Sequence, residues 1–112
     1  MSEAVASLRI EIGAEHPAFA GHFPGRPLLP GVALLAAVLE AAAAERQLAA
    51  AVGPAPHLAW VKFLAPVGPR SSLAISLRLG ETAVDWQVDA CGATVATGRI
   101  VRADLIAVEP PQ

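Results

Sequence analysis

One histidine in a stiff loop, directly ahead of a predicted apolar helix, is the best candidate for chemistry in this chain. His22 is followed by Pro24, Pro27 and Pro30, each of which fixes the backbone φ angle and stiffens the loop. Imidazole titrates near neutral pH, so His22 can take up and release a proton. The helix start at Gly31 has no Ser, Thr, Asp or Asn cap, which leaves the first amides available to an oxygen. We therefore predict a proton-transfer group beside a pocket for an apolar acyl chain.

The elements that must position these groups follow from the hydrophobic pattern. Alternating apolar residues predict a half-buried strand over residues 6–12, and residues 13–29 form a long loop rich in Gly and Pro. A helix is predicted from Pro30 to about Val52, ending at the Gly-Pro pair that follows. Its first half is apolar on every side, so we expect protein to surround it.

Four further strands are predicted over residues 58–65, 72–79, 84–89 and 94–105. The first of them is apolar on both faces, which places it at the centre of a sheet. We expect the four to form an antiparallel meander, with turns at Gly80–Thr82 and Cys91–Gly92, and the sheet to curl around the helix. Gly98 in the last strand predicts a bulge or a close approach of another group.

The composition limits the class of protein. At 112 residues the chain is expected to be a single domain, 1–112. It is 54% hydrophobic, so we expect an obligate homo-oligomer, and a formal charge of −2 argues against a nucleic-acid partner. The lone cysteine, Cys91, and the absence of a leader at the N-terminus fit a cytoplasmic protein. Charged residues interrupt the apolar helix, so no membrane span is expected.

Two stretches resemble a known family. Residues 21–32 (Gly-His-Phe-Pro-Gly-Arg-Pro-Leu-Leu-Pro-Gly-Val) resemble the signature of the hotdog-fold 3-hydroxyacyl-acyl carrier protein dehydratases of the FabZ and FabA type. Residues 61–69 (Val-Lys-Phe-Leu-Ala-Pro-Val-Gly-Pro) are similar to the strand and turn after the central helix of those enzymes. The resemblance implies an α+β hotdog fold, an antiparallel sheet wrapped around one long central helix. It also implies a dimer with each active site in a tunnel at the interface.

The resemblance assigns roles to particular residues. It implies that His22 is the catalytic histidine and that the amide of Gly31, with Val32 at the helix start, contacts the thioester carbonyl. The family's second catalytic group is a Glu or Asp four residues beyond the motif valine, where this chain has Ala36. The nearest helix carboxylate, Glu40, lies about 6 Å further along the axis at 1.5 Å per residue.

Three explanations remain open for the missing acid. Water or another side chain, such as His16 or Glu15, could reach the departing hydroxyl. The substrate could differ. The chain could also pair with a paralogue whose helix carries the acid, because in the related family the histidine and the acid of one site come from different subunits.

Further residues are candidates for substrate contacts. The acyl tunnel could be lined by Phe19, Phe23, Leu28, Leu34 and Leu35, although core packing explains them equally well. Arg26, Lys62 and Arg70 could dock the acidic acyl carrier protein, or they could be ordinary solvated surface. No cofactor is expected, because the substrate brings its own phosphopantetheine. The histidines at positions 16, 22 and 57 lack metal-ligand spacing, so no metal site is expected.

The leading prediction is a dehydratase-like enzyme that acts on 3-hydroxyacyl-acyl carrier protein thioesters in fatty acid, polyketide or aryl polyene synthesis. The alternative is a non-catalytic member, an acyl-binding subunit or the heterodimer partner of such a dehydratase. A hotdog thioesterase is the third and weaker alternative, because those enzymes also use a carboxylate on or near the helix.

Overall fold

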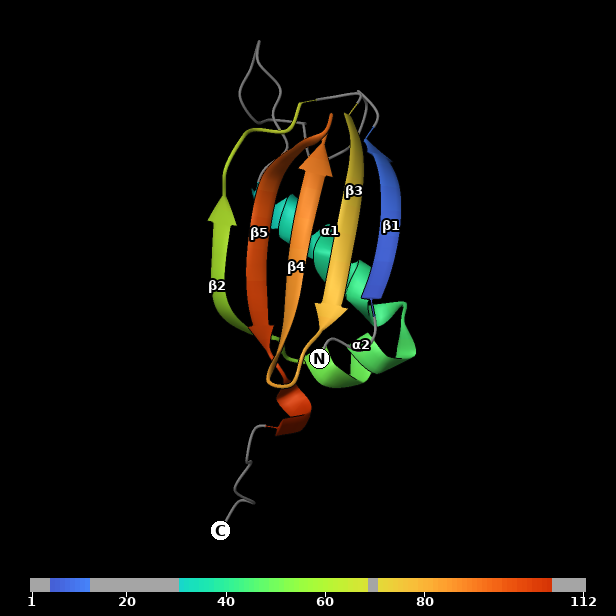
Figure 1. Cartoon of the computed structure of the whole chain (residues 1–112), viewed down its shortest axis with the longest axis vertical. Coiled ribbons are helices and arrows are strands. Elements are labelled where there is room, and N and C mark those ends of the chain that lie inside the picture. Colours follow the sequence, from blue (N-terminus) through green and yellow to red (C-terminus); the bar gives the residue numbers. More distant parts are fainter. Residues whose placement is uncertain (1–4, 13–30, 69–70, 106–112) are drawn as a thin grey trace.

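In the part of the chain that the structure describes, a five-stranded antiparallel sheet packs against a long oblique helix (Figure 1). The structure, a computed structural model, describes residues 5–12, 31–68 and 71–105. The elements are β1 (Val5–Ile12), α1 (Gly31–Ala43), α2 (Arg46–Val52), β2 (His57–Phe63), β3 (Ser71–Leu79), β4 (Ala83–Ala90), β5 (Ala93–Val101) and a short 3₁₀ helix, η2 (Ala103–Leu105).

The strand order is β1-β3-β4-β5-β2, so β2 lies at an edge of the sheet and pairs with β5 alone. The prediction of a central strand here is wrong, and the meander includes only β3, β4 and β5. Most of β2 is exposed, with only Val61 half-buried. A run that is apolar on both faces indicates burial, but it does not say whether the same chain provides the cover.

The two predicted turns are present. The first hairpin closes where the amide of Gly80 donates to the carbonyl of Ala83, at 2.9 Å. At the second, Cys91 and Gly92 both have positive φ angles, 52° and 80°. Positive φ at both central residues matches the right-handed twist of the flanking strands. Because β5 ends at Val101 and η2 follows, the predicted extension of the last strand to residue 105 is wrong.

The predicted helix of residues 30–52 is two helices in the structure. After α1 ends at Ala43, the chain bends, and Glu45 takes an extended conformation as the N-cap of α2. Its carboxylate accepts from the amides of Gln47 at 2.9 Å and Leu48 at 3.1 Å. Alanines on both sides of the bend favour helix equally, so the sequence carries no strong signal for the break.

The core lies between α1 and the inner face of the sheet. Leu34 and Val38 of α1 are buried there, with the predicted alternating residues of the central strands: Leu73, Ile75, Leu77, Val84, Trp86 and Val88. Across β4 and β5, Trp86 pairs with Gly98. A Cβ atom on Gly98 would lie 2.4 Å from Cζ2 of Trp86, which confirms the predicted close approach. Within the described ranges, no helix is long and apolar enough to cross a membrane.

Candidate functional site at the start of α1

The first turn of α1 provides amides without a neutralising charge. Gly31 is the first helical residue, and the first turn of this helix carries no acidic side chain. The positive end of the helix dipole is therefore not compensated from within the helix. In Figure 1 this end of α1 lies behind the sheet near β5 and β2. An oxygen atom placed here would meet hydrogen-bond donors and a favourable field.

An apolar hollow of about 350 Å³ lies beside this helix start. One wall comes from α1, and the other from the end of β2 and the segment that follows it. Its lining consists of Gly31, Leu34, Phe63, Leu64, Ala65, Pro66 and Val67. Of the predicted tunnel residues that the structure describes, Leu34 lines this hollow and Leu35 packs half-buried against the core.

Phe63 lies directly over the helix start. A Cβ atom on Gly31 would lie 2.9 Å from Cζ and 3.0 Å from Cε2 of its ring. The tip of the ring therefore rests on the glycine, in space that any other residue would fill. The sequence pattern predicts no role for this side chain, although it belongs to residues 61–69, the second stretch that resembles the dehydratases, and shares the inward face of β2 with Val61.

Ala36 lies on an exposed face of α1. Val32 and Glu40, one turn before and after it, are exposed as well, and Val32 retains 75% of its accessible surface. The described residues of the chain therefore do not surround the first half of the helix as expected. The face that carries position 36 points away from the chain's own core, so any group that covers it must come from outside the described residues.

Several predicted site residues lie outside the described residues: Glu15, His16, Phe19, His22, Phe23, Arg26, Leu28 and Arg70. Lys62 is described. It is exposed on the outer side of β2, with Nζ 5.8 Å from the centre of the Trp60 ring. At that distance the ammonium and the ring attract each other weakly. Among the residues that the structure describes, no group of three His, Cys, Asp or Glu side chains could hold a metal ion.

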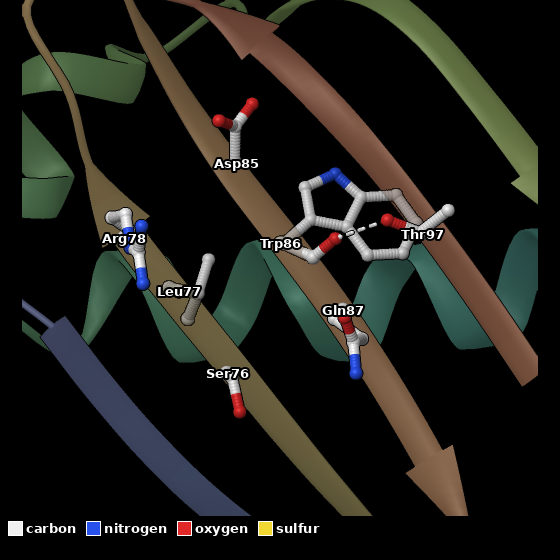
Figure 2. A pocket seen from close by; sticks show the side chains of 7 residues that line it. All are labelled: Ser76, Leu77, Arg78, Asp85, Trp86, Gln87 and Thr97. Carbon is white, nitrogen blue, oxygen red and sulfur yellow. Dashed lines mark hydrogen bonds between the residues drawn. The ribbon is translucent and has the colours of Figure 1, made fainter. Parts of the chain in front are cut away.

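A second hollow, of about 340 Å³, lies over strands β3, β4 and β5 (Figure 2). Its polar side chains are largely bonded within the sheet. Thr97 donates to the carbonyl of Trp86 at 2.9 Å, and Arg99 contacts Asp85 at 2.7 Å. Hydrogen bonding to Asp85 raises the pKa of the Arg99 guanidinium. This pattern is typical of a solvated sheet face, so the hollow at the start of α1 is the better candidate site.

A family profile and a curated relative that match this chain are both described as dehydratases. The profile of a family described as ApeI-like, ApeI dehydratase, matches residues 1–99. A curated relative, the 3-hydroxyacyl-[acyl-carrier-protein] dehydratase FabZ of Bartonella henselae, is 31% identical over 112 residues. The match covers 95% of this chain and 70% of the relative.

Solved structures show the same architecture. The dehydratase heterocomplex ApeI:P of Xenorhabdus doucetiae is similar with a TM-score of 0.70 and 28% identity, covering 87% of this chain and 85% of that chain. An uncharacterized protein of Erwinia carotovora subsp. atroseptica has a TM-score of 0.73 and 25% identity, covering 87% of this chain and 81% of the other. These likenesses confirm the predicted α+β hotdog fold.

Proposed function

Because this chain belongs to the ApeI-like dehydratase family, we propose that it takes part in removing water from 3-hydroxyacyl thioesters carried on acyl carrier protein. The observation that supports this most directly is the start of α1. There an uncompensated helix end, a glycine without a side chain and an apolar hollow occur together, immediately after the His22 motif. Fatty acid, polyketide and aryl polyene synthesis all contain this reaction class, and the cytoplasm is the proposed compartment.

The proposed reaction needs three groups, of which this chain supplies the first two. The thioester carbonyl accepts from the first amides of α1, at Gly31 and Val32, and negative charge that develops on its oxygen is stabilised by the helix end. His22 removes a proton from the α-carbon. A double bond then forms between the α- and β-carbons as the β-hydroxyl takes a proton from an acid, which Ala36 cannot provide and a second chain would supply, and leaves as water. Arg26, Lys62 and Arg70 are the proposed contacts with carrier protein.

The position of Ala36 favours a second candidate, a partner subunit of a two-chain dehydratase. An alanine cannot protonate the departing hydroxyl, and loss of a general acid lowers a rate by roughly 10²–10⁴-fold. Ala36 is on the exposed face of α1, where a second chain can lie against it. Because the Xenorhabdus doucetiae relative is a dehydratase heterocomplex, we propose that this chain pairs with a second hotdog chain that supplies the acid.

A turnover assay tests the proposed function. The purified chain, alone and mixed with a dehydratase paralogue from the same genome, is incubated with 3-hydroxybutyryl-acyl carrier protein, and the conjugated enoyl thioester is followed by absorbance. We expect weak activity alone, activity in the mixture above the sum of the two chains assayed separately, and loss of the weak activity and of that excess in His22→Ala. Release of free thiol in place of enoyl product would favour the thioesterase alternative.

Restoring the carboxylate is the sharper test. Ala36→Glu should raise the activity of the isolated chain by about 10²-fold or more, within the range for a general acid. Ala43→Glu is the matched control, because it adds the same charge to an exposed alanine of α1 about two turns further on. If the isolated chain, Ala36→Glu and the mixture all form no enoyl product, the proposed function is wrong.

A further inference from the structure

The contact between Phe63 and Gly31 has a consequence for substrate choice. We propose that Phe63 is a specificity-determining residue that rejects acyl thioesters branched at the α-carbon. The inference rests on the proposed function, because it assumes that a thioester carbonyl binds at the start of α1. On this proposal the site accepts acyl groups that are unbranched at the α-carbon, and the Phe63 side chain determines this preference.

The walls of the hollow differ in how far they can yield. Leu34 and Val67 are each only 3% exposed and pack against the core. Pro66 has a fixed φ angle. Phe63, by contrast, is 53% exposed, and its ring is held on one side by Gly31. The hollow, at about 350 Å³, is near the small end of the range for ligand pockets. Its capacity next to the helix start is therefore set mainly by where the Phe63 ring lies.

The reacting end of the substrate would meet this ring. A carbonyl oxygen bonded to the amide of Gly31 places the α-carbon only two covalent bonds away from that oxygen. The ring tip already lies within 3.1 Å of the Cβ position on Gly31 through three of its carbons. An unbranched CH₂ is thin enough to pass beside the ring edge, whereas an additional methyl on the α-carbon must displace it. One extra methyl in an apolar pocket changes selectivity by roughly 10–200-fold.

Binding of two unreactive ligands tests the inference. Propionyl-pantetheine and 2-methylpropanoyl-pantetheine differ by one α-methyl, and neither acyl chain carries a β-hydroxyl group, so neither can be dehydrated. Their dissociation constants are measured by titration calorimetry on the native assembly. For the wild type we expect propionyl-pantetheine to bind at least about 10-fold more tightly. In Phe63→Ala the ratio should fall to near one, mainly because the branched ligand binds better.

Leu64→Ala is the matched control. Leu64 is the next residue, is similarly exposed at 57% and lines the same hollow, but it is not among the atoms closest to the Cβ position of Gly31. Its removal should change both affinities together and leave their ratio unaltered. Phe63→Leu provides a milder variant, with an intermediate ratio, in case the alanine variant is unstable.

The outcomes separate this inference from the proposed function. Equal wild-type affinities, no binding of either ligand, or a wild-type ratio in Phe63→Ala and Phe63→Leu would overturn the inference. The expected ratios together with failure of every enoyl assay would support the specificity role and reject only the dehydratase chemistry. Enoyl formation together with a wild-type affinity ratio in both Phe63 variants would support the dehydratase chemistry and reject the specificity role of Phe63.

Discussion

At the scale of single residues, Trp86 and Gly98 pack closely against each other in the core. The register places them directly opposite each other, and a Cβ atom on Gly98 would lie 2.4–2.8 Å from three atoms of the indole. Trp86 is 2% exposed, so its ring has little room to move. We expect Gly98→Ala to lower the free energy of unfolding by about 1–3 kcal/mol through overpacking, as measured by urea denaturation.

Two variants serve as controls for that prediction. Gly68→Ala should be close to neutral, because no atom of the described residues beyond its chain neighbours lies within 4 Å of its Cβ position. In a Trp86→Phe background, the penalty of Gly98→Ala should largely disappear, since the smaller ring leaves space. The indole N–H is also buried without a hydrogen-bond partner in the described part of the chain, so its loss removes an unsatisfied donor. An equal penalty in both backgrounds would contradict the steric explanation.

At the scale of elements, the bend between α1 and α2 carries a side-chain cap at Glu45. The Glu45 carboxylate accepts from two amides of α2, a helix of only seven residues that buries Leu48, Ala51 and Val52. Glu45→Ala should therefore destabilise the protein by about 1 kcal/mol, measured by urea denaturation. Glu45→Asp should recover most of this loss. Glu40→Ala, on the exposed face of α1, should change little; an equal loss there would argue against capping.

The ion pair between Arg102 and Asp104, just after β5, should make a pH-dependent contribution to the stability of the fold. Arg102 donates to the carbonyl of Gly80 and to both carboxylate oxygens of Asp104. These side-chain hydrogen bonds from Arg102 hold the pKa of Asp104 below its usual value, about 3.9. A depressed carboxyl pKa stabilises the fold above that value, and the stabilisation is lost as the pH falls through the folded-state pKa.

Asp104→Asn tests this contribution. We expect the variant to have a lower Tm than the wild type at pH 7, and the difference to shrink as the pH falls from about 5 towards 3, because the wild-type carboxyl becomes protonated. Thermal unfolding followed by circular dichroism measures both. A difference that stays constant over this pH range would show that the ion pair is not its source.

The local hydrophobic pattern of the sequence was sufficient to predict some strands, but it could not predict the position of others in the sheet. Strands β3 and β4 have one buried face, so strict alternation in Leu73–Leu79 and Val84–Val88 was sufficient. The position of β2 was not predictable, because its pairing with β5 depends on contacts far apart in sequence. The same holds for the site: a motif places Gly31 at a helix start, but only the packed structure brings Phe63 onto it.

At the scale of the whole molecule, the exposed apolar surface is unevenly distributed. Among the described residues, the exposed large hydrophobic side chains are Leu8, Val32, Leu58, Trp60, Phe63 and Leu64. All except Leu8 belong to the start of α1, to edge strand β2 or to the residue that follows it. An unpaired edge with apolar neighbours is a site of association, and natural proteins often cover it by pairing with a second chain. We therefore expect the proposed dimer to form through β2.

The two edge strands provide a matched test of that dimer. Leu58 of β2 and Leu8 of β1 are 42% and 44% exposed, and each is paired with a buried inward-facing residue, Ile100 and Ile75. Leu58→Lys should dissociate the assembly to monomers in sedimentation velocity at micromolar concentration, because a charge would be buried at the interface. Leu8→Lys should leave the dimer intact. Dissociation by Leu8→Lys alone would place the interface at β1, and a wild-type monomer would exclude a homodimer and leave pairing with a different chain.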